Sequence, residues 1–213
     1  MAAPILRLDD VASLADLATF VLRAHRADPG GAARLLAHGA VLAVYVCPLS
    51  GGGGPTVLGL RTTALSEPET VDAVVPLAAL ADRLARPENG TDVPVPPGEV
   101  GVAWVGVAPP RGGWEPVGTV GSDVLVRAAE EGIGEVAAGT PATSGAPAVA
   151  SLRARVWGRE LPGTRLPSGA AFVAHALAFV RESDPPVDVF ATGPWTRLSS
   201  ARGHVLTRRA LLG

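Results

Sequence analysis

Tryptophan and arginine lie close together at three places in the sequence, and these pairs are the residues best suited to do chemistry. A guanidinium group stacks favourably on an indole ring, by about 0.5–2 kcal/mol. Tryptophan and arginine are also the residue types that most often dominate the binding energy of protein interfaces. The candidate ligand or interface residues are Arg111, Trp114, Trp157, Arg159, Trp195 and Arg197.

Three explanations account for these pairs. They line a pocket for a planar, anionic ligand, they anchor a protein interface, or the tryptophans fill the edges of the hydrophobic core. The last explanation requires no function. The chain has 18 basic residues, all of them arginine, so that an arginine near a tryptophan is expected by chance. The sequence favours this structural explanation and leaves the other two open.

Patterns of metal-binding and thiol chemistry are not found in the sequence. The single cysteine, Cys47, lies in an apolar run, where a small buried hydrophobic residue is expected. No two histidines form an HxH, HxxxH or HExxH pair, which are common metal-ligand spacings. We therefore predict no metal site. The histidines are His25, His38, His175 and His204.

Nucleophile and phosphate-loop patterns are equally weak. Ser199, Ser200 and His204 are close in sequence, but no Gly-x-Ser-x-Gly elbow is present, and a serine-rich turn explains them. The four glycines at residues 51–54 lack both a lysine and the GxGxxG spacing. Residues 117–122 precede an expected helix and could bind an anion, but capping by Ser122 explains them as well. We predict no catalytic residue and no cofactor.

The composition is that of an oily protein with few charges. Hydrophobic residues make up 47% of the chain and charged residues 18%, below the roughly 25% of typical globular domains. Such a chain is expected to cover part of its surface, either in a homodimer or against a protein partner. The net charge of −2 provides no positive field for nucleic acid.

Neither a membrane span nor a secretory signal is apparent. The longest apolar stretch, residues 40–49, is about half as long as a membrane-spanning helix. Two aspartates follow soon after the start, where a signal peptide would have a basic and then an apolar region. We expect a cytoplasmic protein that does not bind membranes.

Hydrophobic periodicity predicts helices and strands in mixed order. Helical spacing predicts helices over residues 14–25, 77–86, 125–136, 149–156 and 172–180, with a short helical turn over residues 32–37. The expected capping residues are Asp9 or Asp10, Ser122 and Ser168. Strands are expected at residues 40–47, 56–65, 71–75 and 100–107, with an irregular loop at residues 109–116 and a strand and hairpin after residue 187.

Strands and helices in this order do not alternate regularly. We therefore predict a single α+β domain over residues 1–213, with an antiparallel or mixed β-sheet packed with about five to six α-helices. The proline-rich loop at residues 87–98 is where a subdomain boundary would fall.

Segments in the C-terminal half resemble a family of uncharacterised actinobacterial proteins. These segments are VAPPRGGWEPVG at residues 107–118, VWGR at residues 156–159 and AAF at residues 170–172. The family has no assigned activity, so the resemblance implies no catalytic residue. It does imply a GC-rich bacterial source and a cytoplasmic location.

Two hypotheses for the function follow from these observations. The first is a non-enzymatic cytoplasmic protein-interaction or regulatory module, because no set of nucleophile, base and metal ligands is found. The second is a binder of a small anionic ligand, or an enzyme acting on one, through a pocket lined by the arginine and tryptophan pairs. The second hypothesis requires that these pairs converge in space.

Overall fold

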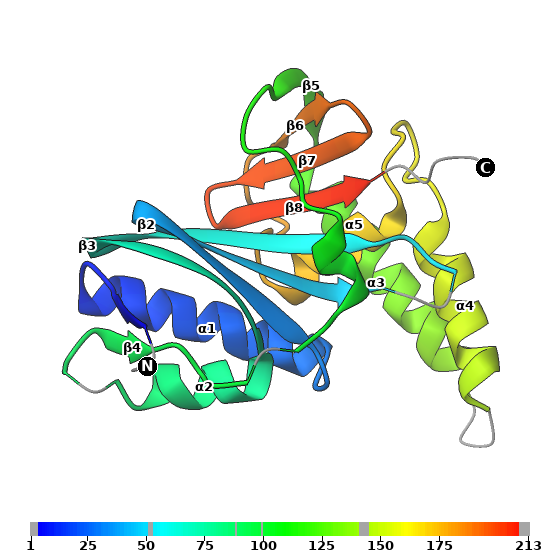
Figure 1. Ribbon diagram of the computed structural model, residues 1–213. Helices are drawn as coiled ribbons and strands as arrows, with labels where there is room; N and C mark the ends of the chain where they lie inside the picture. The colour runs from blue at the N-terminus through cyan, green and yellow to red at the C-terminus, as the bar shows by residue number, and fades with distance from the viewer. Residues whose placement is uncertain (1–3, 51–52, 88, 99, 141–144, 209–213) are drawn as a thin grey trace. The chain divides into compact units, whose positions relative to one another are not determined.

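The structure is a computed structural model that describes residues 4–50, 53–87, 89–98, 100–140 and 145–208. Within these residues it contains five α-helices, a six-stranded antiparallel sheet and a two-stranded sheet (Figure 1). The six strands follow the order β2-β3-β8-β7-β6-β5. The predicted α+β class is confirmed.

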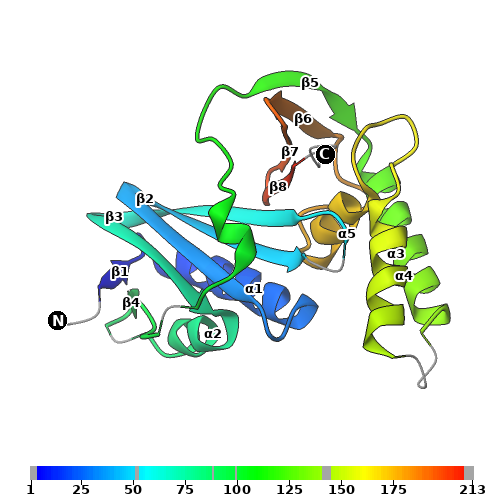
Figure 2. The ribbon, with the colours of Figure 1, turned by 45° about the vertical axis from the view of Figure 1, so that its right-hand side comes forward.

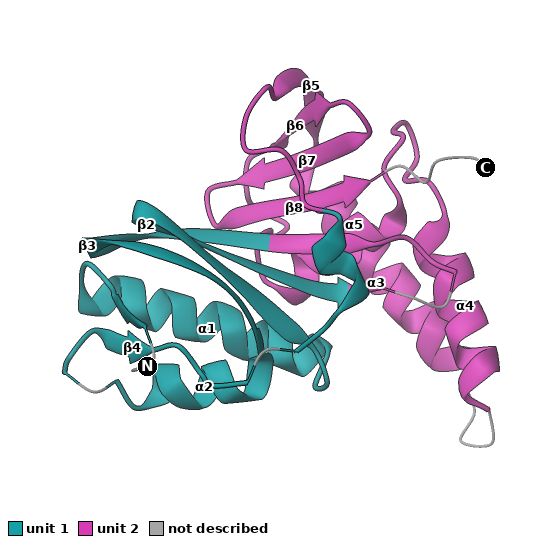
Figure 3. Cartoon of the chain, viewed as in Figure 1, with its two compact units in different colours: residues 1–48, 60–107 teal, residues 49–59, 108–213 magenta. Residues whose placement is uncertain are grey.

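The chain divides into two compact units (Figure 3). Unit 1 comprises residues 1–48 and 60–107, and unit 2 comprises residues 49–59 and 108–213. The two long strands β2 (Ala32–Leu49) and β3 (Val57–Pro76) each contribute residues to both units. The final crossing from unit 1 to unit 2 follows residue 107, beyond the proline-rich loop. That the whole chain acts as a single domain stays a prediction.

Two helices of unit 1, α1 (Val11–Ala27) and α2 (Leu77–Ala85), pack against each other at predicted positions. They lie on the same side of β2 and β3 (Figures 1 and 2). α1 begins at a predicted cap, because the Asp10 carboxylate accepts a hydrogen bond of 2.6 Å from the backbone N–H of Ser13. This bond satisfies one of the N–H groups that the first helical turn leaves unpaired.

The first part of β2 corrects the helical turn expected over residues 32–37. Buried side chains alternate there at Ala33, Leu35 and Ala37, which is the period of a strand. At residues 42, 44 and 46 the buried positions are even-numbered instead. The change falls at Gly39, whose φ of 60° is accessible to glycine without strain and suits an extra residue in a strand. Pairing in the sheet thus overrides the helical propensity of an Ala- and Leu-rich segment.

β3 is one strand where two, at residues 56–65 and 71–75, were expected. The residues between them are polar and mostly exposed. Such a pattern predicts a break between two strands, but the backbone continues as a single strand. Unit 1 also contains the two-stranded sheet of β1 (Ile5–Arg7) and β4 (Asp92–Pro94), which pair antiparallel.

Residues 100–107 do not form the expected strand. They contain the 3-10 helix η1 (Ala103–Gly106), in which the N–H of Val105 donates to the carbonyl of Val102 at 3.2 Å. Gly101 and Gly106 supply no side chains to pack in a sheet. A continuous apolar run does not by itself distinguish a strand from a helical segment.

Unit 2 is organised around the antiparallel strands β6 (Val187–Thr192), β7 (Trp195–Ser200) and β8 (Gly203–Arg208), joined by two tight turns. The predicted C-terminal strand and hairpin are therefore confirmed. On one face of these strands Val187, Val189, Leu198 and Val205 are buried, and on the other face Trp195 and Leu206 are buried as well.

β5 (Glu115–Val120) lies at the end of this sheet and pairs with β6. The irregular loop predicted for residues 109–116 therefore ends before Glu115. The register shifts between Pro116 and Gly118, where φ of Gly118 is 146°. A proline and a bulge make this edge a poor template for another strand, because the ladder of hydrogen bonds is interrupted.

The helices of unit 2 are α3 (Ser122–Ala138), α4 (Ala146–Gly158) and α5 (Ser168–Ala176), which pack on one another, with α3 and α4 side by side (Figure 2). Neither Ser122 nor Ser168 caps its helix as predicted, because each is the first helical residue. Their hydroxyls instead donate to carbonyls elsewhere, Ser122 to Pro185 at 2.7 Å and Ser168 to Val156 at 2.6 Å.

Trp157 packs where α3 and α4 meet, and its ring lies against the backbone of Gly132 in α3. We predict that Gly132→Ala destabilises the protein by about 1–3 kcal/mol, because the new Cβ would lie 2.6 Å from Cη2 of Trp157. Gly134→Ala on the same helix is the matched control. Its Cβ meets nothing within 4 Å, and alanine favours the helix by about 0.5–1 kcal/mol.

Urea unfolding of both variants measures this difference. Equal stability of Gly132→Ala and Gly134→Ala would contradict the close packing of Trp157 on α3.

Candidate functional site

One pair of the predicted tryptophan and arginine residues comes together in unit 2. The guanidinium carbon of Arg197 lies 4.6 Å from the centroid of the Trp114 ring and 4.7 Å from that of the Phe190 ring. The indole N–H of Trp114 donates to the carbonyl of Pro110 at 3.2 Å, which fixes the ring against its own loop. Trp114, Phe190 and Arg197 are called the aromatic–arginine cluster below.

The strand register explains how this cluster forms. In the β6–β7 hairpin Phe190 is directly opposite Arg197, and opposite residues of a ladder project from the same face of the sheet. Trp114 directly precedes β5, whose Pro116 is in register with Phe190. The chain therefore brings Trp114 to Arg197 by pairing β5 and β7 on the two sides of β6.

A second arginine lies on the same face. In the β7–β8 ladder Arg208 is opposite Trp195, and Arg197 is opposite Leu206. Since side chains alternate along each strand, Trp195, Arg197, Leu206 and Arg208 all project from one face. Arg197 and Arg208 are diagonal neighbours there, within reach of a common ligand.

Neither arginine is neutralised within the part of the chain that the structure describes. The Nε atoms of Arg197 and Arg208 are buried without a hydrogen-bond partner, and no described carboxylate forms an ion pair with either residue. Burial lowers the pKa of Arg197, since removal from water disfavours its charged form. The cluster is therefore a partly desolvated cation held by two aromatic rings.

The other predicted candidates have different surroundings. Trp157 is 1% exposed and stacks on Phe172 with ring centroids 4.6 Å apart, so it is part of the core between helices. Arg159 pairs with Glu135 at 2.5 Å, and this bond lowers the pKa of the Glu135 carboxyl. Trp195 is buried at the start of β7.

Arg111, the remaining candidate, is exposed in the segment before β5. Among the described residues, no arginine lies over the tryptophan of its own sequence pair. The contact is instead between Trp114 of one pair and Arg197 of another.

Two residues of this face were missed by the sequence reasoning, Phe190 and Arg208. A signal for both was present. A tight turn at Gly193 and Pro194 places Phe190 opposite Arg197, and a second turn after Ser200 places Arg208 opposite Trp195. The contact between Trp114 and Arg197 had no comparable local signal, because many residues separate them.

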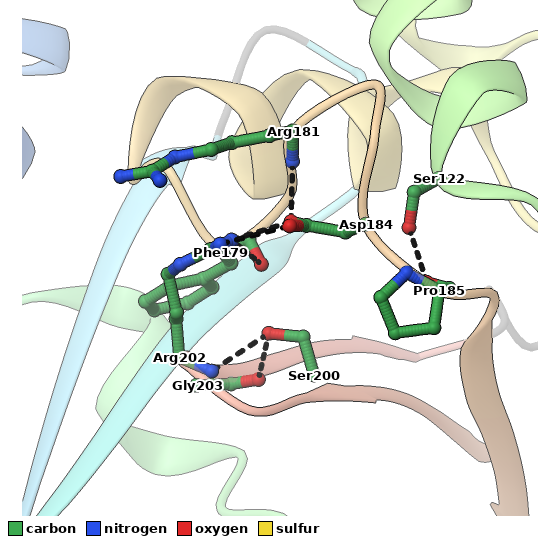
Figure 4. Close-up of polar contacts among 8 residues, drawn as sticks. All are labelled: Ser122, Phe179, Arg181, Asp184, Pro185, Ser200, Arg202 and Gly203. Carbon is green, nitrogen blue, oxygen red and sulfur yellow. Dashed lines mark hydrogen bonds and ion pairs between the residues drawn. The ribbon is translucent and has the colours of Figure 1, made fainter.

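An ion pair fixes the turn between β7 and β8 (Figure 4). The Arg202 guanidinium donates to both carboxylate oxygens of Asp184, at 2.5 and 2.9 Å, and the backbone N–H of Arg181 donates to Oδ2 at 2.7 Å. The bond from Arg202 holds the pKa of Asp184 at about 2, well below its usual value. The segment between α5 and β6 is thereby tied to the hairpin that carries Arg197.

Chemistry of other kinds has less support. Oγ of Ser199 and Nδ1 of His204 form a hydrogen bond of 3.0 Å between neighbouring strands. Among the described residues, no group of three or more His, Cys, Asp or Glu side chains is arranged to hold a metal ion. No described helix has both the length and the hydropathy needed to cross a bilayer.

The Asp184–Arg202 pair predicts a specific pH dependence of stability. A carboxyl whose pKa is lowered in the folded state contributes stability above its unfolded pKa of about 3.9, and this contribution is lost as the pH falls towards 2. Asp184→Asn should therefore unfold at lower urea concentration than the wild type near neutral pH, and the difference should shrink as the pH approaches about 2.

Asp123→Asn is the control, because Asp123 pairs with Arg127 within one helix while both side chains are about half exposed, an arrangement that contributes little. A wild-type-like midpoint for Asp184→Asn at neutral pH, or a difference that persists unchanged in acid, would contradict the role of this pair.

The fold is similar to that of solved sliding clamps. The DNA polymerase sliding clamp of Pseudomonas aeruginosa aligns with a TM-score of 0.52 and 10% sequence identity, over 96% of this chain and 64% of the clamp chain. The beta sliding clamp of C. crescentus aligns with a TM-score of 0.47 and 12% identity, with the same coverage. The chain thus spans less than two thirds of the length of these clamps, and at such identity the likeness concerns the fold alone.

Family models match both halves of the chain. A domain of unknown function, DUF8010, matches residues 1–106, and a second domain of unknown function, DUF8185, matches residues 109–212. No curated protein matches the sequence. The expectation of a family without an assigned activity is confirmed, whereas an actinobacterial origin stays a prediction. The chain is thus covered by a DUF8010 match followed by a DUF8185 match, both of unknown function.

Proposed function

We propose that the chain is a non-enzymatic protein-interaction or regulatory module that binds through the sheet face of the aromatic–arginine cluster. The observation that supports this most is the half-buried Arg197, whose guanidinium lies over the rings of Trp114 and Phe190. Aromatic residues and arginine are enriched at binding hot spots because they combine large apolar area with directional hydrogen bonds. Strands β6 and β7 hold Phe190 and Arg197 of the cluster opposite each other in a hydrogen-bonded ladder.

The fold likeness adds support of a general kind. A protein described as a DNA polymerase sliding clamp, solved with a ligand, shares the fold over 96% of this chain. A fold does not determine a function. The proposal therefore depends on the cluster, with the clamp likeness as a secondary argument.

We also propose that the protein is a cytoplasmic homodimer. Charged residues make up only 18% of the chain, and large apolar side chains such as Val41 and Val117 are more than half exposed. Apolar side chains left in water by one copy can be covered by another.

Light scattering coupled to size exclusion tests this assembly. We expect twice the mass of a single chain at micromolar concentration, independent of salt because apolar burial is not screened. A mass equal to one chain over the whole concentration range would contradict the homodimer.

A second candidate function is the binding of a small anionic ligand by Arg197 and Arg208. It is favoured because, among the described residues, neither arginine forms an ion pair and Nε of each has no hydrogen-bond partner. It differs from the first in what reaches the sheet face, since a small molecule needs no contact with surrounding residues, whereas a protein partner covers many of them.

Photo-crosslinking from the sheet face distinguishes these functions. A benzophenone side chain at position 192 replaces Thr192, which is half-exposed and opposite Trp195 on this face. We expect covalent adducts with a protein in cells of the source organism, identified by mass spectrometry, whose yield falls at least tenfold when Trp114→Ala removes a ring of the cluster. The same side chain at Thr62, an exposed strand residue of unit 1, is the matched control.

Adducts of equal yield and identity from both positions, or none from position 192, would contradict a protein-interaction role for this face.

A further inference from the structure

We infer that the sheet face bearing Arg197 and Arg208 recognises a carboxylate side chain in an acidic segment of a partner protein. This inference rests on the proposed function and names the chemistry of the partner. The site consists of the two guanidinium groups, with Trp114 and Phe190 positioning the first of them.

The first argument is the unsatisfied hydrogen-bonding capacity of the two arginines. Nε of each is buried and has no acceptor among the described residues. A buried N–H without an acceptor is unfavourable, and a bound acceptor removes that cost. An arginine that serves only to stabilise the fold would be expected to have an acceptor, as Arg202 has in Asp184.

The second argument is the position of the Arg197 guanidinium. Its central carbon lies over both the Trp114 ring and the Phe190 ring. A guanidinium carries its N–H donors in one plane, an arrangement that matches the two oxygens of a carboxylate. Contact with the two rings thus restricts the position of the Arg197 donors before any ligand binds.

The third argument is the charge of the surrounding face. Arg208 is the diagonal neighbour of Arg197. Asp188 lies on the same face, exposed opposite Ser199, and forms no ion pair with Arg197 in the described residues. Two cations that have no ion-pair partner among the described residues, and that lie beside apolar rings, attract an anion whose own surroundings are partly apolar.

The source of the anion follows from the shape and chemistry of the face. Apolar rings beside the cations favour a glutamate or aspartate flanked by apolar residues over a fully hydrated inorganic anion, because both the charge and its neighbours find contacts.

A titration followed by the Nε–Hε signals of Arg197 and Arg208 in nitrogen-15 spectra tests this inference. The probe is a blocked six-residue peptide of alternating leucine and glutamate, compared with the same peptide containing glutamine and with inorganic phosphate. Arg197→Lys and Arg208→Lys assign the two signals and keep the positive charge. Circular dichroism verifies that each variant is folded.

We expect saturable shifts of both signals with the glutamate peptide and at least tenfold weaker binding of the glutamine peptide and of phosphate. Arg197→Lys should weaken the glutamate peptide at least tenfold, because lysine has no planar fork. Arg127→Lys, at an exposed helical arginine, should bind as the wild type does.

Three outcomes would overturn the inference. Equal affinity for the glutamine peptide would show docking without carboxylate recognition, equal affinity for phosphate would show a small-anion site, and unshifted signals would show no site. Protein adducts from position 192 that persist in Arg197→Lys would refute this inference and leave the proposed function standing. Peptide binding without any protein adduct in cells would refute the proposed function and the protein partner with it, and would leave only carboxylate binding by the two arginines.

Discussion

The antiparallel register of β6, β7 and β8 is the constraint from which the rest of unit 2 follows. It divides the side chains of these strands into two sets that project from opposite faces. Val187, Val189, Leu198 and Val205 are buried together on one face. A shift by one residue would move Arg197 into that apolar set, so the stability of the core and the position of the candidate site depend on the same register.

Contacts outside the sheet support this register at the β7–β8 turn. Arg202 is held by Asp184, and Gly203 leaves room for Phe179, whose ring atoms would lie 2.5 Å from an added Cβ. Ser122 at the start of α3 bonds the carbonyl of Pro185. The segment between α5 and β6 is therefore connected to a helix at one point and to the hairpin at another, which limits the freedom of the strands that carry Arg197.

Elements with strong local periodicity could be predicted from the sequence, and those decided by distant partners could not. α1 and the C-terminal hairpin have clear caps, turns and alternation, so their positions were predicted. Residues 32–37 were misjudged because their pairing in the sheet outweighs local helical propensity. The position of Phe190 opposite Arg197 was predictable from the hairpin turn. The contact of Trp114 with Arg197 was not, because it depends on the pairing of β5 with β6, and three helices separate these strands in the sequence.

The stacking of Arg197 on Trp114 and Phe190 can be observed directly through the ring-current shifts of the Arg197 side-chain protons. Protons held over the face of an aromatic ring resonate well upfield of those in a free arginine. The cluster described here predicts upfield δ-proton signals for Arg197 that move towards free-arginine values in Trp114→Leu. Signals at free-arginine positions in the wild type, unchanged by Trp114→Leu, would contradict the contact of Arg197 with these rings.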